Sequence, residues 1–397
     1  MFNQKVFKII SIALAFSILL VFKEKTLNSL NLSFGWWSYS EILINYPDQF
    51  VRRGLLGEII QLFSQNSGSI KIVNNFIFFN FLLFVTLLMY TFRRYKLSYK
   101  IIFLYLVFPL GILHMVVFDN FYHRKDLIYL NLFLIVLNLF ITHPEKHKEL
   151  KFITLLFTTV FLGLIHEGLL LLFIPIYIFF IEKYFYKKKL FYVSYRNIFL
   201  ILNLVLFTIS TIFKGNQHQA ENIWNSLHIS DKRLISENIN DFEFNGIGAI
   251  GWSFLEPLNL FYQVLNSGAI FYWVFSFLLI IYFYNSVFFG SDFKLFQFKI
   301  TQSNLINKFY LLYVPILVVG WDWGRWIMVF FYSFTFILLE SLNKEDIKNL
   351  YLSRNNFYFI LLVSFLTVIP EYNISEINYN IFEQYYKFLV NFKNIFL

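Results

Sequence analysis

The chain has 397 residues, of which 58% are hydrophobic and only 14% are charged, and its mean hydropathy is +0.59. Typical soluble domains carry about 25% charged residues, so this composition excludes a set of soluble domains and predicts an integral membrane protein. The net charge of +9 comes from Lys and Arg scattered among short segments between apolar runs. Nucleic-acid binding needs such residues clustered on a solvated face, so we expect no nucleic-acid partner. The chain has no cysteine, which excludes disulfides, thiolate metal sites and cysteine nucleophiles.

Apolar runs of the length of helical membrane spans recur along the chain. The first, 9–22, follows Lys5 and Lys8 and lacks a small-residue cleavage site, so it predicts a signal anchor with a cytoplasmic N-terminus. Further spans are predicted at 72–92, 101–118, 127–142, 152–165, 168–181, 197–213, 268–289, 309–320, 326–340 and 357–370. These runs do not suit the alternating strands of an outer-membrane β-barrel. The predicted fold is all-α: one integral membrane domain over residues 1–397, with about eleven transmembrane helices.

The stretch 152–181 is apolar except for His166, Glu167 and Gly168 in its middle. It is too long for one ordinary span and short for two. Basic residues flank it on both sides, and Lys and Arg concentrate in cytoplasmic loops. Both flanks should therefore be cytoplasmic, which requires two short helices or a re-entrant hairpin with the polar residues at the turn near the outer face.

The resulting topology agrees with the distribution of basic and aromatic residues. Segments placed inside carry 20 of the 33 Lys and Arg residues, as the positive-inside rule expects. All eight Trp fall in outer loops or at outer helix ends, although Trp belts normally occur at both interfaces. This one-sided distribution indicates that the functional side of the protein is the outer face.

Two outer inserts, 23–71 and 214–267, and an outer C-terminal tail, 371–397, complete the predicted organisation. A loop as long as the second insert is usually functional or disordered. The pattern of 54–63 predicts an amphipathic helix, and that of 254–264 predicts short amphipathic helices that lie in the membrane interface.

The first polar cluster of the outer side lies around Asp48, four residues before Arg52. Arg52 and Arg53 precede a glycine and the start of the amphipathic helix 54–63. Guanidinium groups and free backbone N–H groups both favour anions, so this segment is a candidate phosphate-binding site. A surface turn with snorkelling arginines is the structural alternative.

The second cluster runs from Asp119 to Asp126 between two predicted spans. If it is helical, the i, i+4, i+7 spacing places Asp119, His123 and Asp126 on one face. This face is suited to binding a divalent cation, or to holding a general base beside an anion-binding Arg124. A structural turn remains the alternative for the metal site.

The third cluster consists of His166 and Glu167, inside the apolar stretch 152–181. Ionisable residues are costly in hydrocarbon and by default mark a functional cavity. The alternative is a turn at the membrane surface, where charged side chains remain hydrated and cost little free energy.

The fourth cluster, 320–326, links two short apolar stretches and contains three Trp, one Asp and one Arg between glycines. Indole rings stack on the apolar face of a sugar, and arginine binds a carboxylate or phosphate. The alternative is an interfacial Trp anchor with its own ion pair. The residues concerned are Trp321, Asp322, Trp323, Arg325 and Trp326.

With these outer clusters, the sequence resembles polytopic envelope glycosyltransferases of bacteria. The resemblance is to the GT-C superfamily and, more narrowly, to Wzy-type polymerases of O-antigen or capsular repeat units. It covers the topology of the whole chain and two short motifs, Phe50-Val-Arg-Arg-Gly and Trp321-Asp-Trp-Gly-Arg. Asp48 lies where a GT-C enzyme carries its first-loop carboxylate. The sequence departs from the GT-C pattern in one respect: the usual pair of neighbouring acids is absent, because the acids around Asp48, Glu41 and Glu58, are distant from it in sequence.

The resemblance implies a GT-C-like protein of the bacterial cytoplasmic membrane that joins undecaprenyl-diphosphate-linked repeat units on its outer face. Arginines would neutralise the diphosphate, a carboxylate or histidine would deprotonate the attacking hydroxyl, and tryptophans would stack on the glycan. No metal or cofactor is implied, and the partners are the lipid-linked glycans, membrane lipid and a chain-length regulator. The candidate catalytic residues are Asp48, Asp322, Glu167 and His166; the candidate binding residues are Arg52, Arg53, Arg124, Arg325, Trp321, Trp323, Trp326 and His123.

Three alternatives remain open from the sequence, one of which is a structural or assembly membrane protein without chemistry. A GT-C transferase that adds a single sugar from a polyprenyl-phosphate donor would use the same residues. A transporter or flippase of lipid-linked glycans would carry inverted repeats and matching broken helices, and the chain has only the break in 152–181.

Overall fold

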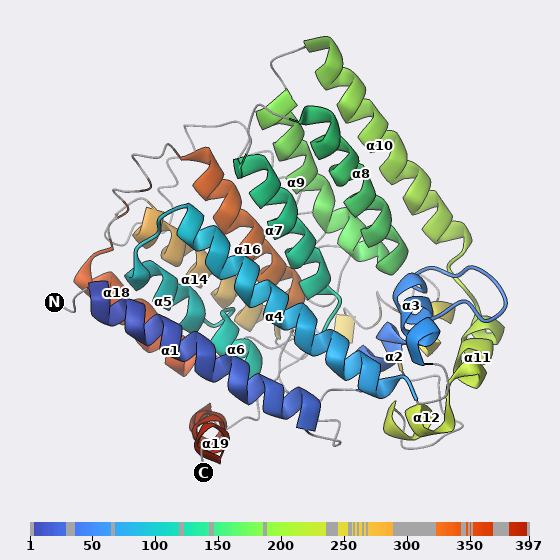
Figure 1. The fold of residues 1–397 in the computed structure, drawn as a ribbon, viewed down its shortest axis with the longest axis horizontal. Coiled ribbons are helices and arrows are strands. Elements are labelled where there is room, and N and C mark those ends of the chain that lie inside the picture. Colours follow the sequence, from blue (N-terminus) through green and yellow to red (C-terminus); the bar gives the residue numbers. More distant parts are fainter. Residues whose placement is uncertain are drawn as a thin grey trace. The chain divides into compact units, whose positions relative to one another are not determined.

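The computed structural model is helical, with no strand among the residues that it describes (Figure 1). These are residues 4–28, 36–64, 68–118, 123–142, 147–185, 189–235, 245–252, 269–288, 323–342, 352–367 and 381–394, with a few single positions at 256–266 and 347–350. The all-α prediction is thus confirmed for the described residues.

The chain forms two compact units. Unit 1 contains Met1–Asn28, Phe81–Tyr122 and Leu258–Leu397, and unit 2 contains Ser29–Asn80 and His123–Pro257. The boundary between residues 80 and 81 lies inside one helix, α4.

Unit 1 is built from long apolar helices that pack on one another. α1 packs along α5 and α6, α18 packs on α5, α14 packs on α16, and α19 contacts α1 and α6. The helices are α1 (Gln4–Lys23) with the π-helical turn η1 (Glu24–Asn28), the second part of α4 (Ile70–Arg94), α5 (Tyr99–Val107), α6 (Ile112–Val117), α14 (Ala269–Phe288), α16 (Trp323–Ser341), α18 (Arg354–Leu366) and α19 (Ile381–Asn394).

Unit 2 combines a layer of long helices with several short ones. α8, α9 and α10 pack on one another, and α7 packs on α8 and α9; these are the green helices of Figure 1. The long helices are α7 (Asp126–Thr142), α8 (Lys148–Ile165), α9 (Glu167–Phe185) and α10 (Lys189–Ile212), with the first part of α4. The short ones are α2 (Trp36–Ile42), α3 (Leu55–Ser64), α11 (Gln217–Ser226), α12 (Ile229–Ile235) and the 3-10 turn η2 (Gly248–Gly251).

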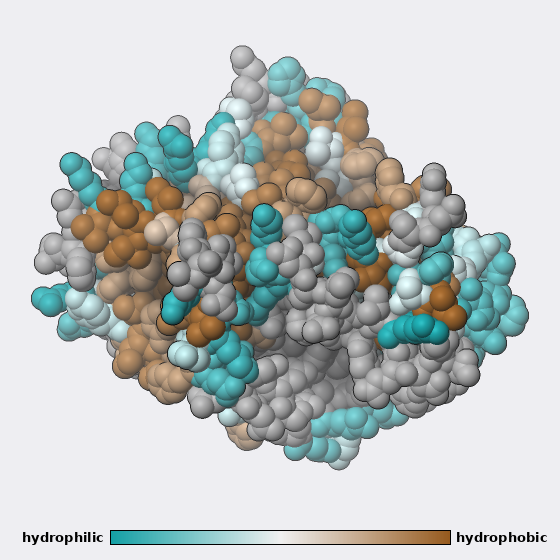
Figure 2. Space-filling model, turned by 60° about the horizontal axis from the view of Figure 1, so that its bottom comes forward, coloured by the Kyte–Doolittle hydropathy of each residue, from teal (hydrophilic) through white to brown (hydrophobic). Residues whose placement is uncertain are grey.

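Large apolar side chains cover much of the outer surface of these helices. Ile153 and Phe157 on α8 are 59% and 65% exposed, and Leu204 on α10 is 67% exposed. Figure 2 shows apolar residues gathered in broad patches on the face it displays. Lipid, rather than water, is the solvent that suits exposed apolar side chains gathered in this way.

Among the described residues, six helical segments are long and apolar enough to cross a membrane. Nine of the eleven predicted spans each coincide with one helix, the span 101–118 is divided into α5 and α6, and 309–320 lies outside the described residues. Several of these helices are shorter or more polar than an ordinary span, so the count of about eleven is not confirmed. The six segments are Gln4–Thr26, Ile70–Arg94, Tyr99–Val117, Glu167–Phe185, Tyr195–Ile212 and Ile270–Phe288.

The break predicted inside 152–181 is present. α8 ends at Ile165, His166 adopts an extended backbone with φ of −168°, and α9 begins at Glu167. The two helices then pack on each other. The sequence pattern therefore correctly predicted two helices with the ionisable pair at their junction.

The predicted outer inserts contain the short helices. A helix, α3, is present where the amphipathic helix 54–63 was predicted; it buries Leu56 and Ile60 and exposes the apolar Leu62 and Phe63, at 67% and 74%. α11, α12 and η2 lie in the second insert. The amphipathic segment predicted at 254–264 lies almost entirely outside the described residues.

Candidate functional site

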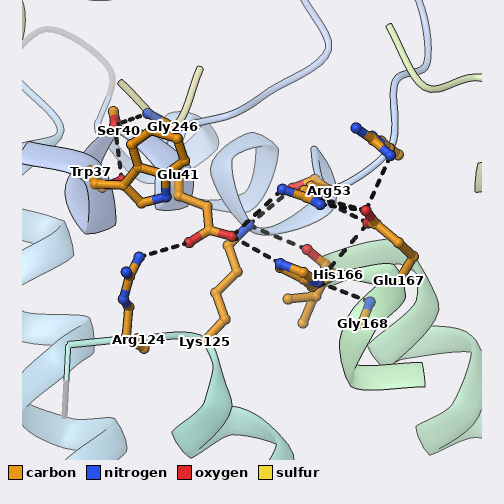
Figure 3. Close-up of polar contacts among 12 residues, drawn as sticks. Trp37, Ser40, Glu41, Arg53, Arg124, Lys125, His166, Glu167, Gly168 and Gly246 are labelled. Carbon is orange, nitrogen blue, oxygen red and sulfur yellow. Dashed lines mark hydrogen bonds and ion pairs between the residues drawn. The ribbon is translucent and has the colours of Figure 1, made fainter. Parts of the chain in front are cut away.

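Glu41, on α2, is a buried carboxylate surrounded by nitrogen atoms (Figure 3). Its side chain is only 4% exposed. Arg124 Nη1 lies 3.4 Å from one oxygen, Oε2. His166 Nε2 and Arg53 Nη1 lie 3.1 Å and 4.0 Å from the other, Oε1. These partners on both oxygens offset the cost of burying the charge.

A second carboxylate, that of Glu167, is bound by two adjacent arginines. Arg53 Nε lies 2.9 Å from Oε2 and 3.1 Å from Oε1, and Arg53 Nη2 donates to Oε1 as well. Arg52 Nη1 lies 3.2 Å from the same Oε1. Glu167 is also the first residue of α9, where the helix dipole favours negative charge. The Glu167 carboxylate therefore occupies an anion position made by two guanidinium groups and a helix N-terminus.

The backbone of the loop before α3 holds the two arginines in place. The Arg52 N–H donates to the carbonyl of Phe213, just after α10, over 2.8 Å. Arg53 has a φ of +68°, in the left-handed region that is costly for a residue with a side chain. The next residue, Gly54, lies against the Tyr46 ring with no room for a Cβ. Backbone strain of this kind persists only where the surrounding structure enforces it, and it often marks functional sites.

Lys125 joins this loop to the end of α8. Its ammonium group donates to the carbonyl of Ile165 over 3.2 Å and to that of Arg53 over 3.4 Å. The residue is 1% exposed. A cation at the C-terminal end of a helix is favoured by the helix dipole, and here it also satisfies a carbonyl that the helix leaves without a partner.

His166 has its protonation state fixed by its neighbours. The Gly168 N–H donates to His166 Nδ1 over 3.0 Å, so this nitrogen carries no hydrogen. Nε2 then bears the hydrogen and donates to Glu41. Burial and the nearby Arg53 guanidinium lower the pKa of His166 below its ordinary value. The neutral ring is therefore the favoured form, and both of its nitrogen atoms are engaged.

A loop of the second insert packs against the back of α2. Gly246 N–H donates to Ser40 Oγ over 2.8 Å, and the rings of Trp37 and Trp252 lie 5.4 Å apart. A Cβ on Gly246 would come within 2.8 Å of the Glu41 backbone nitrogen, so only glycine allows this approach. The insert thus helps to fix the helix that carries Glu41.

These residues form one charged cluster in unit 2. Four cations face two carboxylates, which leaves a formal charge of +2 with His166 neutral. Such a balance favours an anionic ligand. The residues of the charged cluster are Glu41, Arg52, Arg53, Arg124, Lys125, His166 and Glu167.

The structure brings together five residues that the sequence had proposed from three separate segments: Arg52, Arg53, Arg124, His166 and Glu167. His123, which precedes Arg124 in the chain, is also buried, at 6% exposure. Asp119, its expected partner in a metal site, lies outside the described residues. In the described part of the chain, no group of three or more metal-binding side chains comes together.

Asp48 lies elsewhere in unit 2. It is exposed, and its carboxylate accepts a hydrogen bond from Asn222 on α11 over 2.5 Å. The two residues line a shallow hollow together with Val51 and Ile223. No contact joins Asp48 to the charged cluster among the interactions of the described residues.

The fourth predicted cluster belongs to unit 1. Arg325, near the start of α16, is buried at 4% exposure, and Trp326 is half-buried with no hydrogen-bond partner for its indole nitrogen among the described residues. Trp323 is the first residue of α16. Trp321 and Asp322 lie outside the described residues.

Sequence reasoning missed two residues of the charged cluster, Glu41 and Lys125. Glu41 had been considered only as a distant neighbour of Asp48, although an acid inside the largely apolar run 36–44 was a signal of its burial. Lys125 follows Arg124 directly in the second polar cluster. Two adjacent cations just before a helix start are unusual, because acids are preferred there.

The family model described as "Uncharacterised membrane protein Rv1490" matches residues 7–175 of this chain. The matched stretch contains every residue of the charged cluster. Comparison with curated proteins and with solved structures gave no match. The family match and the six long apolar helices agree on the coarse assignment: this is a helical, multi-pass membrane protein.

Proposed function

We propose that this protein is a membrane glycosyltransferase of the polymerase type, which joins lipid-diphosphate-linked oligosaccharide repeat units at the charged cluster. The observation that carries the proposal is the binding of one carboxylate, Glu167, by both Arg52 and Arg53 at the start of α9. A phosphate, like a carboxylate, has two oxygen atoms that can accept parallel hydrogen bonds from one guanidinium group. A diphosphate would therefore bind the arginine pair in competition with Glu167.

The surroundings of the arginine pair support this role. The Nε atom of Arg52 is buried without a hydrogen-bond partner among the described residues, so acceptors of the protein do not saturate this guanidinium. Its side chain is 19% exposed, which leaves it reachable, while Arg124 at 1% exposure is fully enclosed. The net positive charge of the charged cluster compensates an entering anion.

Glu41 is our candidate for the base. In the proposed step it accepts the proton of the attacking sugar hydroxyl. The hydroxyl oxygen forms a bond to the anomeric carbon of the second glycan, and the bond from that carbon to the diphosphate oxygen breaks. The electron pair leaves with the diphosphate, whose developing charge Arg52 and Arg53 stabilise.

Glu41 suits this role better than Glu167, His166 and Asp48, whereas Asp322 lies outside the described residues. Both arginines lie within 3.2 Å of the Glu167 carboxylate, while the nearest arginine nitrogen lies 3.4 Å from that of Glu41, so Glu41 keeps the greater basicity; both nitrogens of His166 are occupied. Asp48 is exposed and bound to Asn222. His166 and Arg124 instead position the Glu41 carboxylate.

The test is the cell-surface glycan pattern of a strain that lacks the gene. Complementation with wild type should restore long chains, whereas Arg53→Ala and Glu41→Gln should leave glycans with a single repeat unit. Arg233→Ala is the matched control, because Arg233 is an exposed arginine of α12 in the same unit. It should behave as wild type at equal protein levels.

Other outcomes would overturn this assignment. An unchanged ladder in the deletion strain would rule out a polymerase. Loss of one sugar from every repeat unit would identify single-sugar transfer from a polyprenyl-phosphate donor instead. Accumulation of complete repeat units on the cytoplasmic side would identify a flippase.

A further inference from the structure

The last helix, α19, has three distinct sides. Tyr385 and Phe388 face the rest of unit 1, since Phe388 is 7% exposed. Phe382, Tyr386 and Leu389 form a second, apolar side and are 72%, 67% and 61% exposed. Their i, i+4, i+7 spacing places them in one stripe.

The third side of α19 is charged. Glu383 and Lys387 form an i, i+4 ion pair of 2.8 Å, and both side chains are more than half exposed. One helix therefore presents an apolar stripe and a charged stripe next to each other, and the side chains of both stripes are more than half exposed. This division is typical of helices that lie in the plane of a membrane surface.

The packed side places α19 at the end of a candidate membrane span. Tyr385 OH lies 3.1 Å from His114 Nε2, and the Tyr385 ring packs edge-on against Phe118 at 5.6 Å. Phe118 is the residue directly after the span Tyr99–Val117. The end of a span is where the hydrocarbon region gives way to the polar surface.

The direction of α19 agrees with this position. Figure 1 views α19 almost end-on, whereas α1, which it contacts in the same unit, is seen from the side. The two axes therefore cross steeply. Since α1 belongs to the candidate span Gln4–Thr26, a helix that crosses it steeply runs along the membrane surface.

We propose that α19 is an in-plane membrane helix whose stripe of Phe382, Tyr386 and Leu389 is covered by lipid acyl chains, with Glu383 and Lys387 in the headgroup layer. The occupant of the stripe is lipid, because the stripe lies beside the end of a span and the adjacent charged stripe needs water or headgroups. This inference is independent of the proposed function.

The absence of cysteine allows a direct test with the full-length protein in phosphatidylcholine and phosphatidylglycerol nanodiscs. Single cysteines replace Phe382, Leu389, Glu383 or Lys387 and carry a nitroxide spin label. Collisions with oxygen, which concentrates in hydrocarbon, and with a water-soluble nickel chelate are then measured by electron paramagnetic resonance. Two reference sites are Phe16→Cys in α1, 57% exposed in a candidate span, and Glu221→Cys on the exposed surface of α11.

Labels at positions 382 and 389 should resemble the Phe16 reference, with frequent oxygen and rare nickel collisions. Labels at 383 and 387 should shift towards the Glu221 reference. Equal nickel access at all four positions would show that the stripe lies in water and overturn the proposal. Spin–spin broadening between labels at position 389, lost on dilution with unlabelled protein, would show a second copy on the stripe and overturn it as well.

Discussion

The ammonium group of Lys125 donates to two backbone carbonyls, and the residue is almost fully buried. Loss of this group should therefore lower the stability of the charged cluster. Lys125→Met keeps the stem but leaves the carbonyls of Ile165 and Arg53 without this donor. Each unsatisfied buried group costs about 1–3 kcal/mol, so we expect a clearly lower thermal unfolding midpoint in detergent and loss of activity. Lys214→Met, at an exposed position after α10, is the control and should unfold as wild type does. Equal midpoints for the two variants would contradict the role assigned to Lys125.

His166 gives a prediction about pH. Its pKa is lowered in the folded protein, so between the lowered value and the ordinary value near 6.5 the unfolded chain binds a proton that the folded chain does not. Stability therefore rises with pH in this range and is lost as pH falls below about 6.5.

His166→Gln removes this titration while retaining an N–H group for Glu41. The unfolding midpoint of wild type should fall more between pH 7.5 and pH 5.5 than that of the variant, with circular dichroism in detergent as the measurement. All other histidines are common to both proteins, so the difference reports on His166. Parallel pH profiles would show that folding does not shift the pKa of His166, which would contradict the environment described for this ring.

Helix packing provides a matched pair of glycine substitutions. Gly246→Ala forces a Cβ within 2.8 Å of backbone atoms of Glu41 and Trp37, which cannot move without displacing α2. Overpacking of this kind costs about 1–3 kcal/mol. Gly163→Ala, inside α8, has the side chains of Leu206 and Leu170 as its nearest neighbours, at 3.3 Å and 3.7 Å; these can adjust, and the substitution gains helix propensity.

We therefore expect Gly246→Ala to lower the unfolding midpoint and the activity, and Gly163→Ala to leave both nearly unchanged. Thermal unfolding and the glycan ladder are the two measurements. If Gly246→Ala were as stable and active as wild type, the loop 245–252 would not be the support of α2.

At the scale of the elements, the apolar pattern predicted helices well. The junction at 166–167 was recognised because two ionisable residues interrupt an apolar stretch with basic flanks on both sides. The amphipathic helix α3 was recognised from its period. The division of 101–118 into α5 and α6 was missed, although Pro109 and Gly111, the N-cap of α6, mark the interruption at 108–111.

For the whole molecule, the predicted topology is the property to test first. Lys214→Cys, predicted outside, should react with a membrane-impermeant maleimide in intact cells from which any outer membrane has been removed. Arg94→Cys, predicted inside, should react only after the membrane is permeabilised. Both side chains are exposed, and no native cysteine interferes. The reverse pattern would place the charged cluster on the cytoplasmic face and contradict the proposed use of outer-face substrates.

The sequence by itself determined the class of the protein, its helices and most of the polar residues of the charged cluster. It could do so because hydrophobic periodicity and the cost of burying charge are local properties of the chain.

Only the tertiary structure decided which of these residues act together. Glu41 lies more than eighty residues from Arg124 and more than a hundred from His166, and no local pattern connects them. The structure separates Asp48 from the charged cluster although it is closer in sequence to Arg53 than Glu41 is. The reason is physical: the loop before α3 turns at Arg53 and returns to the junction of α8 and α9, so helix packing determines which carboxylate meets the arginines.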